Sequence, residues 1–197
     1  MTAETPKSYR NTERTRRVIL DAAAHAIVEK GTGVSLADVA STAGVSKSGL
    51  LHHFSNREQL FLAVAEDANE RLRNGVLAHL DLSENHPGKL LRAYVRALCG
   101  GDLDVAQYFA SSPMWNGLFS LASVAELMNA DAQWWSDQFA LDGLDPSLIQ
   151  VVRRAAEGIA AAAGFGEESP ESVAQGREVL LAMTEPRPAD ALLPIRR

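Results

Sequence analysis

Apolar residues recur every three or four positions along nearly the whole chain, and this helical period constrains the fold most strongly. The first apolar stripe consists of Ile19, Ala22, Ala23, Ala26 and Ile27. It ends just before a glycine, the residue that most often terminates a helix. No segment shows the alternation of apolar and polar residues that a half-buried strand requires. The sequence therefore predicts an all-α fold.

Capping residues place the next two helices, which are short. Ser35, followed three residues later by Asp38, predicts a capping box at the start of the first. Gly44 can adopt the left-handed conformation of a tight turn after it. Ser46 can accept a backbone amide bond and so cap the second short helix, which we expect over 47–53.

The remaining helices are predicted from caps, breaks and periodicity. Ser55 and Glu58 predict a capping box for a long fourth helix that runs to the Asn-His-Pro-Gly break at 85–88. Later helices are expected at roughly 88–100, 104–111, a short segment between Pro113 and about 122, 124–140, 145–164 and 169–184. The last two begin with an Asp-Pro and a Ser-Pro pair, because proline suits the first helical position. Residues 185–197 are expected to form a loose tail.

The net charge of −6 argues at first against a nucleic-acid partner, but the charge is unevenly distributed. Residues 1–60 hold eight basic and six acidic side chains, whereas residues 61–197 hold 11 and 19. Five of the basic residues lie within the first 17 positions. A mildly basic head therefore precedes an acidic body, and an anionic partner could bind the head.

The single cysteine, Cys99, excludes an intramolecular disulfide and a zinc site made of thiolates. Residues 1–17 lack the apolar core of a signal peptide, so we expect an intracellular, cytoplasmic protein. The longest uncharged run, 105–125, is interrupted by polar residues and a proline. We therefore expect a buried or pocket-lining stretch there, and no membrane partner.

The two short helices and their glycine turn satisfy the geometry of a helix-turn-helix. The second helix carries Lys47, Ser48, Gly49 and His52 at exposed positions. These side chains are small or form hydrogen bonds, as entry into a major groove about 12 Å wide requires. A helical hairpin in an ordinary bundle would produce the same pattern, so the pattern alone leaves both interpretations open.

The sequence of these segments resembles the N-terminal domain of the tetracycline-repressor (TetR) family over about residues 12–62. The resemblance is carried by Thr15 to Ala23, Gly31, Leu36 to Ala40 and above all Ala43 to Phe54. It implies an N-terminal three-helix helix-turn-helix domain at 1–60, with a basic arm at 1–11, and a helical effector-binding and dimerisation domain at 61–184. The implied function is sequence-specific transcriptional regulation, by a repressor that a small-molecule effector releases from its double-stranded DNA operator.

The resemblance also assigns roles to individual residues. It places groove contacts on Lys47, Ser48 and Gly49, and phosphate contacts on Ser35, His53 and Arg57.

One position departs from the family's pattern. Where the family often has a tyrosine whose hydroxyl meets the DNA backbone, this chain has Leu51, followed by His52. Either His52 takes over that contact or the contact is lost. We expect Leu51 and Phe54 to be core residues.

Most of the aromatic side chains lie between residues 94 and 139. An apolar pocket with a few polar groups is typical of a small-ligand site. The candidate ligand-binding residues are Tyr94, Tyr108, Trp115, Phe119, Trp134 and Phe139. A plain hydrophobic core would use the same residues, and the sequence does not identify a ligand.

The helices at 145–164 and 169–184 are the predicted dimer interface. The first contains Gly158 among many alanines, and small side chains allow helices to approach closely. A partner helix within the same chain would explain this equally well. The resemblance to a dimeric family favours a homodimer.

The two other classes of protein are an enzyme of helical fold and a dimer whose head does not read DNA. The sequence has no His/carboxylate metal spacing, no glycine-rich phosphate loop and no nucleophile motif, so we expect neither an enzyme nor a bound cofactor or metal. The alternative to a DNA-binding regulator is a helical ligand-binding or protein-binding dimer whose head does not read DNA specifically. The acidic body and the leucine at position 51 leave that alternative open.

Overall fold

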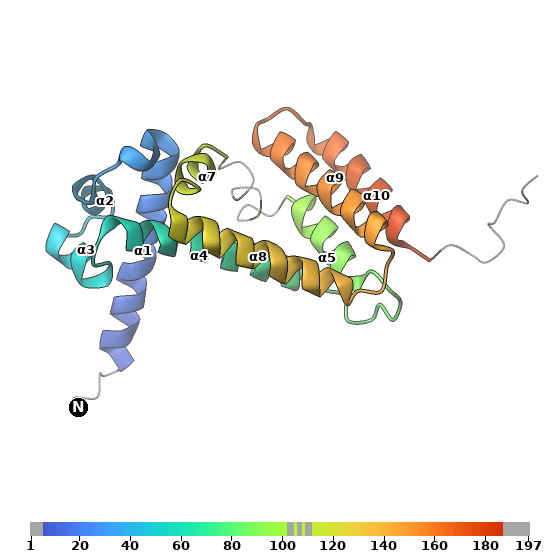
Figure 1. Cartoon of the computed structure of the whole chain (residues 1–197), viewed down its shortest axis with the longest axis horizontal. Coiled ribbons are helices and arrows are strands. Elements are labelled where there is room, and N and C mark those ends of the chain that lie inside the picture. The colour runs from blue at the N-terminus through green and yellow to red at the C-terminus, as the bar shows by residue number, and fades with distance from the viewer. Residues whose placement is uncertain (1–5, 102–104, 106–107, 109–111, 187–197) are drawn as a thin grey trace, which may run out of the picture. The chain divides into compact units, whose positions relative to one another are not determined.

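The computed structural model describes residues 6–101, 105, 108 and 112–186, and the regular structure of these residues is entirely helical. The first elements are α1 (Pro6–Lys30), the 3-10 turn η1 (Gly31–Gly33), α2 (Leu36–Thr42), α3 (Lys47–His53) and α4 (Arg57–Ala78). They are followed by α5 (Lys89–Leu98), α7 (Ser112–Leu118), α8 (Ala122–Ala140), α9 (Pro146–Gly164) and α10 (Pro170–Thr184) (Figure 1). The predicted all-α fold is confirmed.

The chain forms two compact units. The first unit comprises Met1–Glu70 and Ser111–Ala132, and the second comprises Arg71–Ala110 and Gln133–Arg197. Helices α4 and α8 each contribute residues to both units. The first unit is larger than the expected head at 1–60, because it also includes α7 and the first part of α8.

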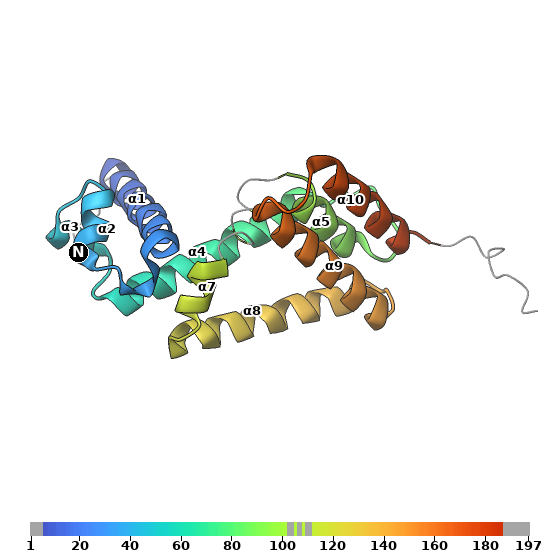
Figure 2. The same ribbon diagram turned by 90° about the horizontal axis from the view of Figure 1, so that it is seen from above.

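In the first unit, α1 packs against α2, η1 and α7 (Figure 2). The predicted apolar stripe of α1 is buried, with Ile19, Ala23 and Ile27 fully inaccessible to solvent. Helix α1 begins at Pro6, so it already includes the second half of the expected arm at 1–11. The first turns of α1 therefore precede the part of the helix that carries the buried stripe.

In the second unit, α9 packs against both α5 and α10, and the three helices lie side by side in both views (Figures 1 and 2). Their core contains Tyr94, Trp135 and Phe139. The Tyr94 ring meets the Trp135 and Phe139 rings edge-on, with centroids 5.2 and 5.4 Å apart. This geometry is favourable for aromatic pairs because it opposes ring edge to ring face.

The N-terminus of α5 is capped by a residue distant in sequence. Its N-cap residue, Gly88, has no side chain to offer and adopts a left-handed φ of 91°. The Asp142 carboxylate instead accepts hydrogen bonds from the backbone amides of Leu90 and Leu91, at 2.9 and 2.8 Å. A carboxylate also interacts favourably with the positive end of the helix dipole.

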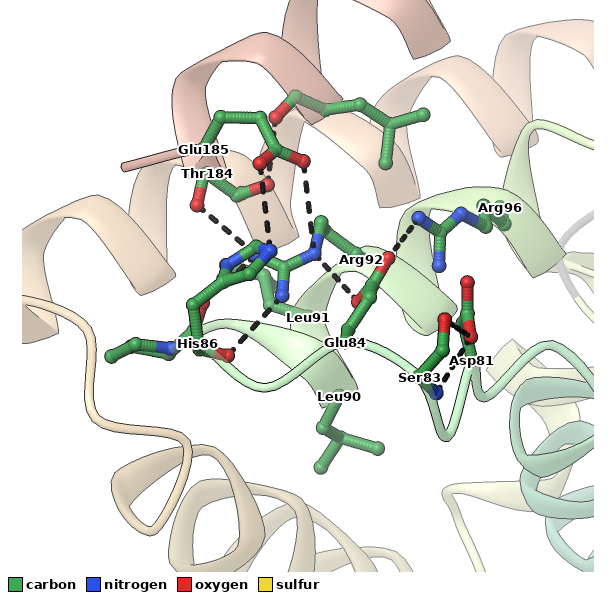
Figure 3. Close-up of polar contacts among 12 residues, drawn as sticks. Asp81, Ser83, Glu84, His86, Leu90, Leu91, Arg92, Arg96, Thr184 and Glu185 are labelled. Carbon is green, nitrogen blue, oxygen red and sulfur yellow. Dashed lines mark hydrogen bonds and ion pairs between the residues drawn. The ribbon is translucent and has the colours of Figure 1, made fainter. Parts of the chain in front are cut away.

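A fully buried arginine, Arg92, joins the 84–88 loop to the end of α10 (Figure 3). Its Nε donates to the Glu84 carboxylate at 2.8 Å, and its Nη1 donates to the carbonyls of Pro87 at 2.8 Å and Thr184 at 3.1 Å. Arg96 donates to the other oxygen of Glu84. A buried guanidinium is tolerated only where its donors are satisfied in this way.

Both ends of α4 differ from the prediction. At its start, the Asn56 side chain accepts from the Gln59 amide at 2.8 Å, and the Gln59 side chain accepts from the amide of Ser55. The cap is therefore Asn56 with Gln59, and the predicted Ser55–Glu58 box is wrong. Asparagine is as good an N-cap as serine, so the sequence offered two adjacent choices.

At its other end, α4 stops at Ala78 instead of continuing to the break at 85–88. The Asp81 carboxylate accepts hydrogen bonds from both the amide and the hydroxyl of Ser83, at 2.9 and 2.6 Å. Such a local bond offers the backbone an alternative to the helix. The segment after α4 is consequently a series of turns.

Several later boundaries follow the prediction closely. Asp145 and Ser169 cap α9 and α10, and each is followed by proline in the first turn. Pro113 lies in the first turn of α7, where a missing amide is tolerated. Most of the helix expected at 104–111 and most of the tail expected at 185–197 lie outside the described residues.

Candidate nucleic-acid interface

Local hydrogen bonds build the α2–turn–α3 segment. The Ser35 hydroxyl oxygen accepts from the Asp38 amide, and the Asp38 carboxylate accepts from the Ser35 amide, so the predicted capping box is present. Gly44 has a φ of 66° and makes the turn. Ser46 then caps α3 by accepting from the Gly49 amide at 3.0 Å. These features confirm the predicted helix-turn-helix geometry.

Helix α3 divides into a buried face and an exposed face. Leu50 and, just after the helix, Phe54 are buried in the first unit. The exposed residues are Lys47, Ser48, Leu51 and His52. The prediction that Phe54 belongs to the core is confirmed. The same prediction for Leu51 is wrong, because its side chain is 39% exposed.

The sequence pattern could not decide between the two adjacent leucines of α3. In a helix of seven residues, neighbouring side chains point about 100° apart, so only one of the pair can face the core. In the folded first unit, Leu50 is the leucine that is fully buried. Leu51 therefore shares the exposed face with the predicted reading residues, which the sequence analysis missed.

Gly49 and His53 lie at the margins of this face and are half-buried. A Cβ added at Gly49 would approach the Ser46 hydroxyl oxygen to 3.1 Å, so the glycine leaves room for the cap. Burial lowers the pKa of His53, and the neighbouring charges of His52 and Arg16 lower it further. At neutral pH, His53 is therefore a neutral hydrogen-bonding group.

The two other predicted phosphate-binding residues are exposed but already have partners within the chain. The Ser35 hydroxyl donates to the Asp38 carboxylate at 2.7 Å. Arg57 donates to the Thr32 carbonyl at 3.1 Å, and its guanidinium lies 5.6 Å from the Phe61 ring centroid. Arg57 thus connects the start of α4 to η1 and still presents charge to solvent.

Helix α1 contacts the end of the α2–turn–α3 segment through another arginine, Arg16. The Arg16 guanidinium lies over the Phe54 ring, 5.2 Å from its centroid, which is a favourable cation–π distance. Arg16 therefore places positive charge beside the end of α3. Arg17, one residue later, is paired with Asp67 of α4.

The predicted ligand-binding residues do not all lie in one unit. Tyr94, Tyr108, Trp134 and Phe139 belong to the second unit, whereas Trp115 and Phe119 belong to the first, where their rings lie 6.3 Å apart. Within the second unit, Tyr94 and Phe139 are buried in the core, and Trp134 is packed against it. The Arg73 guanidinium covers the Trp134 ring at 4.3 Å.

A concave surface between α8 and α9 adjoins these aromatic residues. Its apolar lining includes Phe139, Leu144 and Ile149, and its polar edge carries Arg153 and Arg154. Both arginines pair with Glu157, which also accepts from the Tyr94 hydroxyl at 3.0 Å. Burial raises the pKa of Tyr94 well above its usual value, and the Glu157 charge adds to this, so the phenol stays protonated.

The part of the chain that the structure describes contains no group of three or more His, Cys, Asp or Glu side chains that could hold a metal ion. None of its helices is both long and apolar enough to cross a membrane.

A capped helix-turn-helix with a polar, partly basic exposed face, followed by a helical unit, defines the class of helix-turn-helix transcriptional regulators. The family model described as bacterial regulatory proteins, tetR family, matches residues 19–64. A second model, described as tetracyclin repressor-like, C-terminal domain, matches residues 88–185. The chain belongs to the TetR family of bacterial regulatory proteins.

Similar proteins are found among curated sequences and solved structures. The HTH-type transcriptional regulator BetI of Rhizobium meliloti (strain 1021) is 29% identical over 112 residues, which are 56% of this chain and 53% of BetI. The chain thus matches about half the length of this relative.

Two solved structures illustrate the shared fold. A putative TetR-family regulator from Rhodococcus sp. has a TM-score of 0.65 at 21% identity, with 88% of this chain and all of that chain covered. The multidrug binding protein EbrR, complexed with imidazole, has a TM-score of 0.59 at 25% identity, with 90% and 92% covered.

Proposed function

We propose that the protein is a homodimeric transcriptional repressor whose α3 helices bind two half-sites of a double-stranded DNA operator. The observation that carries this proposal is the exposed face of α3, where Lys47, Ser48 and His52 stand clear of the core on a helix held by the Ser46 cap. Short polar and basic side chains on one helix face are suited to base edges in a major groove.

In this proposal, residues 1–60 bind DNA, and phosphate contacts come from Ser35, His53 and Arg57 around the groove-reading face. Arg57 contributes charge, whereas His53 contributes a neutral hydrogen bond at pH 7 because its pKa is lowered by burial and by nearby positive charge. The two residues should therefore affect salt dependence differently, since the slope counts neutralised phosphates.

The experiment begins with selection of bound sequences from a random DNA pool by the purified protein. On the selected operator, Lys47→Ala should weaken binding at least tenfold and relax sequence preference. Arg57→Ala should reduce the slope of log affinity against log salt by about one unit, whereas His53→Gln should leave that slope unchanged at pH 7.5. Lys89→Ala, which removes a basic side chain of α5, is the matched control. Selection of no sequence would favour the alternative, a dimer whose head does not read DNA.

The dimer is proposed to form through α9 and α10, residues 145–164 and 169–184. Large apolar side chains are exposed on both helices, including Val151 at 56% and Val179 at 55%. A Cβ added at Gly158 would meet nothing within 4 Å, so this glycine is not explained by packing within the chain. At Gly176, by contrast, the added Cβ would lie 2.7 Å from Ile159, which accounts for the close approach of α10 to α9.

Sedimentation velocity tests this interface. Gly158→Trp should give monomers and weaken operator binding strongly, because two linked heads are needed to engage both half-sites. Asp137→Trp, at an exposed position of α8, should remain dimeric. A wild-type protein that is monomeric at micromolar concentration would contradict the proposed assembly.

The effector is proposed to bind among the aromatic residues of the second unit and to release the protein from DNA. Helix α4 supports this coupling because its residues 57–70 belong to the first unit and 71–78 to the second. A ligand that shifts α4 could alter the spacing of the two heads. Addition of an effector should change tryptophan fluorescence, and Trp134→Phe should reduce that change while operator binding without ligand persists.

A further inference from the structure

We infer that Leu51 reads a thymine in the operator through contact with its C5-methyl group. This inference rests on the proposed DNA-binding function and extends it to one position of sequence preference. It starts from the exposed face of α3, on which Leu51 is the one apolar side chain among the helix's seven residues, Lys47–His53.

The core on this side of α3 is already occupied without Leu51. Leu50 and Phe54 already fill the buried side of this segment, and both are essentially inaccessible to solvent. Leu51 lies three and four residues after Ser48 and Lys47, so the three side chains are neighbours on the helix surface. A surface that meets Lys47 and Ser48 therefore also meets Leu51.

The chemistry of a leucine limits what it can recognise in a major groove. It neither donates nor accepts a hydrogen bond, so it gains nothing from a phosphate oxygen. Where it covers a polar base edge, that edge loses its hydrogen bond to water and gains none in return. Thymine is the base that presents a methyl group there, and burying that methyl against leucine removes apolar surface from water. The preferred contact of Leu51 is consequently a thymine.

The family resemblance explains what is exchanged at this position. A tyrosine at the same position would bind the DNA backbone through its hydroxyl, a contact that fixes position but carries no sequence information. Leu51 cannot make that bond. It exchanges a sequence-independent contact for one that distinguishes bases.

Removal of one methyl group at a time from the operator tests this inference. In the operator selected from the random pool, each thymine of one half-site is replaced in turn by deoxyuridine, which removes only the C5-methyl. Fluorescence anisotropy then measures the affinity of the wild type and of Leu51→Ala for every duplex. At one thymine, the wild type should lose about fourfold in affinity, the value of one buried methyl group. Leu51→Ala should be insensitive at that thymine and should respond like the wild type elsewhere.

Two further variants sharpen the test. Leu82→Ala removes an 81% exposed leucine outside α3 and should behave as the wild type on every duplex. Leu51→Tyr should bind all sequences more tightly and lose the thymine preference. Circular dichroism checks that each variant keeps its helical content.

The outcomes separate this inference from the proposed function. If a specific operator is bound but no deoxyuridine position distinguishes the wild type from Leu51→Ala, Leu51 does not read a thymine, although the DNA-binding function stands. If no operator is selected, the proposed function fails and the inference fails with it.

Discussion

The polar contacts that shape the helix-turn-helix of the first unit and those that hold α5 in the second unit differ greatly in sequence span. In the first unit, the hydrogen bonds that shape the helix-turn-helix join residues only three positions apart, as in Ser35 with Asp38 and Ser46 with Gly49. In the second unit, Arg92 bonds to Thr184 across 92 positions, and Asp142 caps Leu90 across 52. The helix-turn-helix is therefore shaped by local sequence, whereas α5 is held by segments that meet only after folding.

The difference affects what a substitution disrupts. A local cap stabilises one helix end, which can fray without unfolding its neighbours. A long-range bond joins two or three segments, and its loss leaves buried groups unpaired in all of them. We therefore expect larger effects on stability from long-range contacts than from local caps.

The largest effect is expected for Arg92→Met. The substitution removes the buried donor of Glu84 and of three backbone carbonyls, which should lower the free energy of unfolding by about 3–5 kcal/mol. Urea denaturation followed by circular dichroism measures this loss. Arg154→Ala, which removes an arginine that is 68% exposed, should change stability by less than about 1 kcal/mol.

Cys99 provides a second measurement for the same variant. It is the chain's single cysteine and is buried in the second unit, where burial raises its pKa to about 11. A thiol reagent at pH 8 should therefore label it only when that unit opens. Labelling should accelerate in Arg92→Met, and an unchanged rate would show that the Arg92 contacts do not hold the second unit closed.

A smaller loss is expected for Asp142→Ala. The carboxylate caps two amides at the start of α5, so its removal should lower the free energy of unfolding by about 1–2 kcal/mol. Asp137→Ala, at an exposed site on α8, should change it by less than about 0.5 kcal/mol. Equal effects of the two substitutions would contradict the role of Asp142 as a distant cap.

Local caps should matter less again. Asn56→Ala removes the acceptor that caps α4 and should lower stability by about 1 kcal/mol in urea denaturation. Ser55→Ala should have an effect within about 0.5 kcal/mol, since its hydroxyl does not cap the helix. The reverse order of these effects would restore the cap predicted from the sequence.

The smallest effect concerns acid. The Ser35 hydroxyl and backbone amide hold the pKa of Asp38 below its usual value by hydrogen bonding. The folded state therefore binds a proton less readily than the unfolded state. The resulting stabilisation is present above the unfolded pKa of about 3.9 and is lost as the pH falls through the lower folded pKa. Urea midpoints between pH 5 and 2.5 should fall less steeply for Asp38→Asn than for the wild type, and parallel curves would exclude this contribution.

The comparison also explains which features were predictable from the sequence. Ser35, Gly44 and Ser46 lie beside the turns that they form, so their residue types alone indicated the geometry. Leu51 was assigned wrongly because two adjacent leucines fit the same pattern, and only the folded structure shows that Leu50 is the buried one. The Asp142 cap was not predictable, since the residues around Asp142 in the sequence give no indication that it lies beside the start of α5.

The Arg92 contacts also bear on how freely the sequence of the 84–88 loop can drift. Of the four acceptors within 3.4 Å of its guanidinium, those of His86, Pro87 and Thr184 are main-chain carbonyls, and only Glu84 contributes a side chain. Every amino acid supplies a main-chain carbonyl. A relative could therefore replace most of this loop, and the end of α10, without losing the connection, provided that it keeps an arginine and a carboxylate eight residues apart. Such a pair is easily overlooked when distant sequences are aligned, although it joins segments from opposite ends of the domain.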